Sequence, residues 1–373
     1  MRLKKSSTTE VSATRRGFGS ATWLLPALLL WSQPGSAKDS ILKSDPEYNK
    51  GPKVYGYVQV QVVNLPLDTN GDGESNEGRA RVQRARLSVE GRINKWISYE
   101  LDIDPRPPEI DGFMRDAYFN LELSDNHRLR IGQQKTIFGY ENSRSSSKLY
   151  MVNRTELADN MARGVNLRDQ GVSLLGRGSI GGGTRMNYAI QVVNGGGMNT
   201  QRDNNKAKNV WGRFGLRNAK GASRKWQWGV STGIGDQFEP YEPFEYIAAT
   251  DSTDEITGAF IKFKRFGTDF RVEKSRFDLN GEFAIGPEKE LGEEETIYAY
   301  YMTAIGKTSR PFGPLLRYEA FFDEFTRWTV GAYSGEPTDA FRVLLNYEFR
   351  WEEGDADENV ADDRLYLWTQ VRL

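Results

Sequence analysis

The chain has 373 residues and no cysteine, with 50 basic residues, 51 acidic residues and a single histidine, His127. The lack of cysteine excludes disulfides, thiolate metal sites and cysteine nucleophiles, and one histidine leaves a Ser-His-Asp triad a single candidate base. A net charge of −1 argues against a general nucleic-acid binder, which carries a basic excess. We therefore expect no cofactor, no nucleic-acid partner and no enzymatic activity.

The first 37 residues have the layout of a secretory signal peptide. Basic residues dominate residues 1–20, an apolar run follows at residues 21–31, and small residues stand at Gly35-Ser36-Ala37. The run is too short for a membrane-spanning helix, which needs about 20 apolar residues, and this order is typical of an exported precursor. We expect cleavage after Ala37, with residues 38–52 as a short periplasmic lead-in. Arg15-Arg16 also resembles a twin-arginine signal, so the export route stays open.

Apolar and polar side chains alternate along the chain from residue 53 onward. Between residues 84 and 92, for example, Ala85, Leu87 and Val89 form one face, and the residues between them are polar or charged. A period of two indicates β-strands. We predict sixteen strands that begin near residues 53, 80, 96, 113, 127, 167, 184, 210, 226, 256, 269, 295, 314, 326, 341 and 363.

Three features favour a membrane barrel over a soluble sandwich. The strands are about nine to twelve residues long, the length that a tilted strand needs to cross a membrane, and tryptophans lie near their ends, as in the aromatic girdles of barrels. Short connections such as Gly267-Thr268 alternate with long ones such as residues 142–166 and 283–294. The predicted fold is all-β: a transmembrane antiparallel barrel of about sixteen strands over residues 53–373, in the bacterial outer membrane.

Two motifs allow other interpretations. Residues 176–181 match the GxGxxG string of dinucleotide sites, but that motif requires a following helix and a strand pattern follows here, which favours a turn. Asp68, Asn70 and Asp72 resemble the start of a calcium loop, although the twelfth position holds Arg79 instead of glutamate. A solvated hairpin loop is the alternative at that place.

Arginines gather on one face of the predicted barrel wall. Arg84, Arg86 and Arg92 have the same parity within one strand, and rings of Arg or Lys are a means by which pores select anions. Carboxylates such as Asp102 and Asp104 lie on the neighbouring strand. A lattice of paired charges that only braces the wall is therefore the alternative.

Several stretches in chain order resemble the phosphate-selective porin O/P family: residues 82–87, 115–118, 130–139, 153–154 and 167–171. Ile137 stands where that family usually has proline, and Leu373 stands where barrels usually have an aromatic residue. The resemblance implies a homotrimer in outer-membrane lipid, with a third loop folded into the lumen and passive uptake of small anions such as phosphate. The pore-lining, anion-binding residues that it implies are Arg84, Arg86, Arg130, Lys135, Arg154, Arg163 and Arg168.

Two other functions remain open for such a barrel. A porin without anion preference is one, because the chain without its signal peptide would be net negative and its long loops are acid-rich. A scaffold or conduit that houses a partner protein, such as an electron-transfer assembly, is the other, because the charges on the wall are balanced. The third loop distinguishes a scaffold from a porin, since a loop folded into the lumen leaves a partner protein no room. A barrel lipase or protease is disfavoured by the single rim histidine.

Overall fold

The computed structural model describes residues 43–63, 78–106, 113–161, 168–200, 207–218, 225–240, 258–290, 293–309, 311–322, 325–352 and 363–373. The chain divides into a unit Met1–Ser44 and a unit Asp45–Leu373, and the strands belong to the second. The expected signal peptide, the calcium-loop residues Asp68, Asn70 and Asp72, and the pore candidate Arg163 lie outside the described residues.

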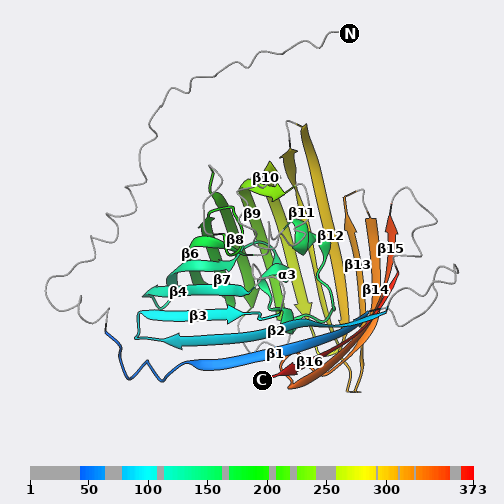
Figure 1. Ribbon diagram of the computed structural model, residues 1–373, viewed down its shortest axis with the longest axis horizontal. Coiled ribbons are helices and arrows are strands. Elements are labelled where there is room, and N and C mark those ends of the chain that lie inside the picture. Colours follow the sequence, from blue (N-terminus) through cyan, green and yellow to red (C-terminus); the bar gives the residue numbers. More distant parts are fainter. Residues whose placement is uncertain are drawn as a thin grey trace, which may run out of the picture. The chain divides into compact units, whose positions relative to one another are not determined.

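Within the described residues, sixteen strands form one closed antiparallel barrel (Figure 1). Each strand pairs with its sequence neighbours, and β1 pairs with β16 to close the ring. A closed ring satisfies the backbone N–H and C=O groups between strands, which a membrane requires, so the predicted fold is confirmed. The strands are β1 (Lys53–Val63), β2 (Arg79–Arg92), β3 (Ile97–Ile103), β4 (Met114–Ser124), β5 (His127–Lys135), β6 (Arg168–Gly181), β7 (Thr184–Val193), β8 (Asn209–Asn218), β9 (Lys225–Pro240), β10 (Gly258–Glu273), β11 (Phe277–Glu290), β12 (Glu293–Gly306), β13 (Gly313–Phe321), β14 (Phe325–Ser334), β15 (Phe341–Glu352) and β16 (Arg364–Arg372).

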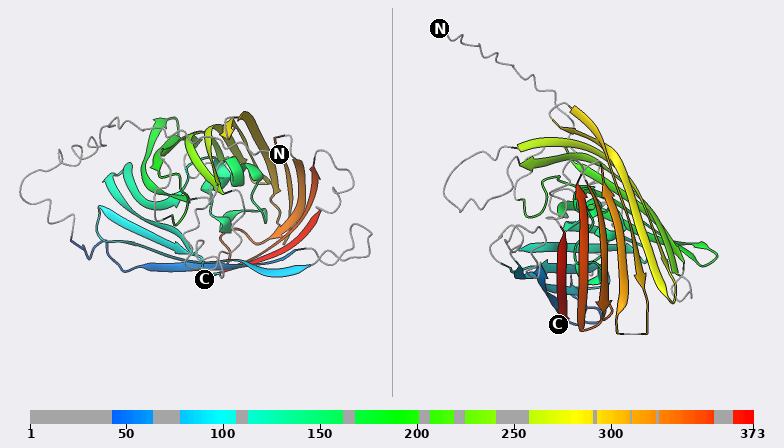
Figure 2. Two further views of the ribbon diagram at one scale, coloured as in Figure 1. Left: turned by 45° about the horizontal axis from the view of Figure 1, so that its top comes forward. Right: turned by 90° about the vertical axis from the view of Figure 1, so that its right-hand side faces the viewer.

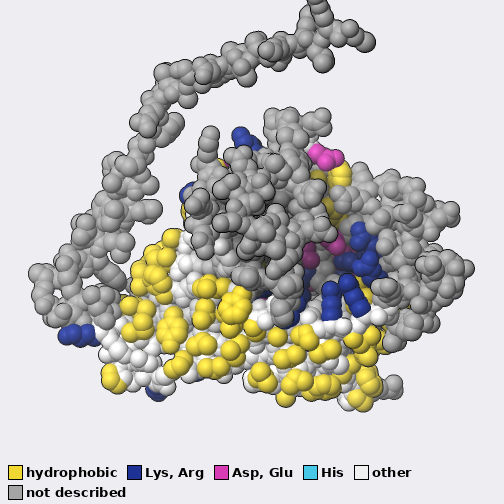
Figure 3. Space-filling model, in the orientation of Figure 1, with side chains coloured by type: hydrophobic (Ala, Val, Ile, Leu, Met, Phe, Trp, Pro, Cys, Tyr) yellow, Lys and Arg dark blue, Asp and Glu magenta, His cyan; other side chains and the backbone are white. Residues whose placement is uncertain are grey.

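The alternation of side chains sets an apolar outer face against a polar inner face. On β2, the side chain of Arg86 is 6% exposed and that of its neighbour Leu87 is 38% exposed, because successive residues of a strand point to opposite faces. Figure 3 shows a belt of hydrophobic side chains on the outer surface, with Lys and Arg side chains in the opening above it. This arrangement is the inverse of a soluble protein and suits a barrel that stands in lipid.

The two rims of the barrel differ. Tight turns at residues 93–96, 125–126, 182–183 and 274–276 lie on one rim, which we call the short-turn rim. Longer connections, such as that between β5 and β6, lie on the opposite rim. Outer-membrane barrels carry their short turns on the periplasmic side.

One predicted connection and one predicted loop are wrong. The expected turn at Gly267-Thr268 lies inside β10, which continues to Glu273, and the true turn is at residues 274–276. The expected loop at 283–294 is largely strand, because β11 runs to Glu290 and β12 begins at Glu293. Gly267 serves packing instead of a turn: a Cβ atom there would lie 2.7 Å from the Phe138 ring.

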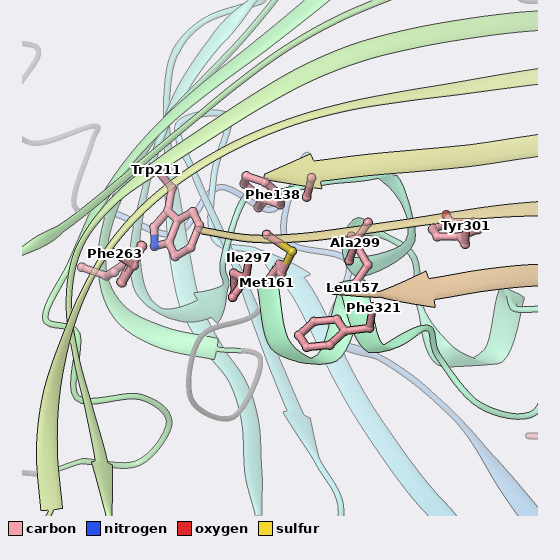
Figure 4. Packing of buried hydrophobic residues seen from close by; sticks show 11 residues of the cluster. Phe138, Leu157, Met161, Trp211, Phe263, Ile297, Ala299, Tyr301 and Phe321 are labelled. Atoms are coloured by element: carbon pink, nitrogen blue, oxygen red, sulfur yellow. The ribbon is translucent and has the colours of Figure 1, made fainter. Parts of the chain in front are cut away.

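The chain between β5 and β6 lies inside the ring of strands (Figure 2). We call residues 136–161 the β5–β6 segment; it holds α3 (Tyr140–Ser143), the 3-10 helix η2 (Ser146–Lys148) and the π-helix η3 (Leu157–Met161). None of the helices in the described part of the chain is long and apolar enough to cross a membrane. Figure 4 shows side chains of this segment packed against the wall, in a cluster of Phe138, Leu157, Met161, Val193, Trp211, Phe263, Ala284, Ile297, Ala299, Tyr301 and Phe321.

A second apolar cluster holds the middle of the segment. Met151 and Val152 pack against side chains of β12 to β16, among them Leu344 and Trp368. Burial of a large apolar side chain is worth about 1.5–3 kcal/mol, so two clusters fix the β5–β6 segment firmly to one side of the interior.

Candidate pore site

Guanidinium and carboxylate groups alternate on the inner wall formed by β2 to β6. Arg86 Nε donates a hydrogen bond of 3.0 Å to Asp104 Oδ2, and its Nη1 lies 3.6 Å from Asp102 Oδ2. Arg168 Nη2 donates to Asp116 Oδ2 at 2.6 Å. Two of the predicted pore residues are thus held by carboxylates, which fixes their positions and offsets much of their charge.

Arg84 has a different environment on the same wall. Its Nη1 donates hydrogen bonds of 3.0 Å to Gln59 Oε1 and to Gln83 Oε1. Amide oxygens orient a guanidinium without neutralising it, so the positive charge of Arg84 remains effective in the lumen.

Lys135 and Arg154 meet at the end of helix α3. Lys135 Nζ donates to the backbone oxygens of Asn142 and Arg144 at 3.1 and 2.6 Å. Arg154 Nη2 donates to the same Arg144 oxygen at 2.8 Å, and its Nη1 donates to the backbone oxygen of Glu141. Among the described residues, no ion pair or hydrogen bond joins Arg84, Lys135 or Arg154 to a carboxylate. We call these three residues the amide-held cations, because their side chains donate to amide oxygens.

Repulsion between like charges links five of the predicted pore residues. Arg84 is repelled by Arg154 and Arg86, and Lys135 is repelled by Arg154 and Arg168. Sequence parity could group residues only within one strand, and the closed register brings β2, β5, β6 and the β5–β6 segment together.

Arg130 lies apart from these five residues, nearer the short-turn rim. Its Nε donates to Asn120 Oδ1 at 2.9 Å, and its guanidinium stacks 3.8 Å from the centre of the Tyr118 ring. It therefore belongs to a separate part of the wall.

Arg115 also belongs to the site, although the alternation pattern of the sequence predicts that it faces outward. The pairing of β3 with β4 shifts between Asp102 and Ile103, which leaves Arg115 as the extra residue of a β-bulge. A bulge re-aims the side chain that it carries, and Arg115 Nη2 lies 3.9 Å from Asp104 Oδ2. No signal in the alternation pattern marks such a bulge.

Glu141 anchors the β5–β6 segment to the opposite wall. Its carboxylate accepts hydrogen bonds from the backbone N–H and the hydroxyl of Thr155, at 2.9 and 2.8 Å, and from Arg317 Nη2 at 2.9 Å. Burial by itself raises the pKa of Glu141, but Arg317, Arg154 and the Thr155 hydrogen bonds outweigh burial and hold this pKa below its ordinary value. The carboxylate is therefore ionised at neutral pH.

Further hydrogen bonds tie the segment to β9 and β15. The Gly139 N–H donates to Ser231 Oγ at 3.1 Å, and the Val152 N–H donates to Asn346 Oδ1 at 2.9 Å. Arg342 donates to the backbone oxygens of Ser147 and Leu149, at 3.0 and 3.1 Å. No pattern in the sequence marks these wall residues, because each contacts a segment more than ninety positions away.

Comparison with known families places the chain. A family profile described as phosphate-selective porin O and P matches residues 53–302. The chain belongs to the phosphate-selective porin O and P family. Membership confirms the resemblance found in the sequence and makes the chain a porin of the bacterial outer membrane. A search of curated proteins finds no match.

Several solved structures have the same fold at low sequence identity. An anion-selective porin from Comamonas acidovorans is 13% identical, with a TM-score of 0.56 over 86% of this chain and 98% of that chain. The trimer form of OmpT, an outer membrane protein of Vibrio cholerae, is 11% identical, with a TM-score of 0.57 over 87% of this chain and 99% of that chain. OprB of Pseudomonas putida is 11% identical, with a TM-score of 0.55 over 87% and 94%. At these identities the likeness shows the fold alone.

Proposed function

We propose that this member of the phosphate-selective porin O and P family is a passive channel with a preference for small anions such as phosphate, and not an enzyme. The observation that carries the proposal is the group of amide-held cations: Arg84, Lys135 and Arg154 donate to neutral oxygens and form no ion pair with another described residue. Fixed cations of this kind replace part of the hydration shell of a passing anion. The anion-selective porin from Comamonas acidovorans supports this reading as a relative in fold.

The β5–β6 segment is proposed to narrow the pore from the side opposite the wall of β2 to β6. It is anchored by Glu141 to Arg317 and by Val152 to Asn346, so its free side is turned toward the wall of Arg84 and Arg86. A folded segment in the interior also argues against the scaffold or conduit function, because a partner protein would need that space.

The remaining expectations fit the same proposal. Residues 1–37 would direct export as a signal peptide, and residues 38–52 would form the periplasmic lead-in before the barrel. A homotrimer in outer-membrane lipid is proposed, since one similar structure is a trimer form.

Reversal potentials in planar bilayers under a potassium chloride gradient test the proposal. We expect the native channel to prefer chloride, and the double variant Arg84→Glu, Arg86→Glu to lower the chloride-to-potassium permeability ratio several-fold, because two inward cations become anions. A matched control is Lys274→Glu with Arg276→Glu, which makes the same charge change on the exposed turn between β10 and β11. Cation preference of the native channel, or equal effects of the two double variants, would refute the proposal.

Phosphate itself is tested by competition. In single-channel recordings, phosphate added to chloride should reduce the chloride current more than an equal concentration of sulfate, if the channel has a preference for phosphate. An equal reduction by both anions would leave anion preference intact and remove the phosphate assignment.

A further inference from the structure

A polar cavity lies on the inner wall at the short-turn rim. Its volume is about 380 Å³, within the range of cavities that hold small molecules. Inward-facing residues of β2 to β5 form its floor, and the lead-in residues Tyr48, Lys50 and Gly51 form one side. None of the five clustered pore residues lines it.

The lead-in is held in place by its own turn and by the rim. The Asp45 N–H donates to the Ile93 oxygen at 2.8 Å, and the N–H groups of Tyr48 and Asn49 donate back to the Asp45 oxygen at 3.0 and 2.7 Å. Arg92 lies 5.9 Å from the centre of the Tyr48 ring. The cavity is therefore bounded by a folded segment of this chain.

Basic residues outnumber acidic ones around the cavity. Five cations line it, against the two carboxylates Glu90 and Glu100. Two of the cations have carboxylate partners, since Lys53 Nζ lies 3.9 Å from Glu90 and Arg128 Nε lies 3.5 Å from Glu122, and Glu100 accepts a hydrogen bond from the Tyr118 hydroxyl. The five cations are Lys50, Lys53, Arg92, Arg128 and Arg130.

Two of these cations lie over tyrosine rings. Arg130 lies 3.8 Å from the Tyr118 ring centre and donates to Asn120 through Nε. Its two Nη groups donate to no other described residue. Arg92 faces Tyr48 and uses Nη2 for the Lys95 oxygen at 2.8 Å. Flat guanidiniums with available donors beside aromatic rings match a carboxylate attached to an aromatic ring.

We propose that this cavity binds small anions that carry an aromatic ring, with aromatic carboxylates as the representative class. The carboxylate would take the Nη donors of Arg130 and Arg92, and the ring would pack against Tyr48 and Tyr118. This goes beyond a preference for anions at the amide-held cations, and it does not depend on that preference.

Block of the chloride current by benzoate tests the inference on the full-length channel in planar bilayers. Cyclohexanecarboxylate is the matched probe, because it has the same charge and nearly the same size but no aromatic face. We expect benzoate to halve the current at a several-fold lower concentration than cyclohexanecarboxylate. In the variants Arg92→Gln and Tyr48→Leu, the half-blocking concentration of benzoate should rise about three- to tenfold, the range for one cation–aromatic contact.

Lys274→Gln is the matched control, since Lys274 lies 5.3 Å from the Phe277 ring centre on the same rim but outside the cavity. It should leave block by benzoate unchanged, and the open-channel conductance of every variant reports whether the barrel has folded. Equal block by the two probes, or unchanged block in both cavity variants, would overturn the inference. Reversal potentials are measured separately, so failure of the anion preference and failure of this site are distinguishable.

Discussion

The two sides of the barrel interior use arginine in opposite ways. On the wall of β2 to β6, arginines pair with carboxylates or amides along the face that borders the opening. On the wall of β13 to β15, Arg317 and Arg342 contact the β5–β6 segment, although their exposed fractions of 4% and 0% are about as low as the 6% of Arg86. There the guanidiniums donate to the covering segment. An inward arginine is therefore bound to the wall itself or anchors the inner segment, depending on the groups to which it donates.

The largest loss of stability is expected when the ion pair between Arg317 and Glu141 is removed. Arg317→Ala leaves Glu141 buried without its ion-pair partner, which should cost up to about 3–5 kcal/mol of unfolding free energy, because only Arg154 and the Thr155 hydrogen bonds then offset the buried charge. Urea unfolding followed by tryptophan fluorescence measures this loss. Arg372→Ala, which removes one rim hydrogen bond to Pro337, is the control and should cost far less. If the two variants unfolded alike, the covered wall would not be an anchor.

A smaller loss is expected at the glycine that admits Phe138. Gly267→Ala places a methyl group against the Phe138 ring, and such overpacking costs about 1–3 kcal/mol. The double variant Gly267→Ala, Phe138→Leu should recover part of that loss, since the smaller side chain makes room. Strict additivity of the two changes in urea unfolding would contradict this contact.

Substitutions on the wall of β2 to β6 should change the permeability ratio more than the unfolding free energy. Arg84→Gln removes two hydrogen bonds to neutral amides, so the unfolding free energy should fall by about 1–3 kcal/mol at most. The chloride-to-potassium permeability ratio should fall in the same variant, because one lumen cation is gone. A fall in stability as large as that of Arg317→Ala would erase the difference between the two walls.

The smallest effect concerns pH. Because the pKa of Glu141 is lowered in the folded protein, its ion pair stabilises the docked segment at any pH above its ordinary value of 4.5 and loses that contribution as the pH falls below it. The part of the current noise that depends on Glu141 should therefore stay constant from pH 7 to pH 5 and increase under more acidic conditions. The difference in noise between the native channel and Glu141→Gln isolates this part, and a rise of that difference already at pH 6 would contradict the assignment.

The sequence predicted the barrel because its physics is local. Alternation such as Arg86 beside Leu87 follows directly from the strand period, and fifteen of the sixteen predicted strand starts agree with the structure within two residues. Gly267-Thr268 was wrongly predicted as a turn, because in the sequence a glycine needed for close packing resembles a glycine needed for a turn.

The site was predicted only in part. The residues on the β2 wall were recognisable from parity and from the family resemblance. Arg115 was missed because a bulge reverses parity, and Arg317 was missed because its partner lies 176 positions away. Contacts across the interior depend on how the whole ring closes, and no window of sequence contains that information.

The pairing of β1 with β16 has a consequence for how the protein assembles. Gln59 Nε2 donates to Gln370 Oε1 at 2.8 Å across 311 positions, and the Leu373 N–H donates to the Gly56 oxygen at 2.9 Å. Contacts this distant in sequence form slowly, and until they form, two strands expose unpaired edges that attract other chains. We therefore expect ring closure to be the slow folding step, and the unpaired edges of β1 and β16 to make the chain prone to association with other chains until they pair.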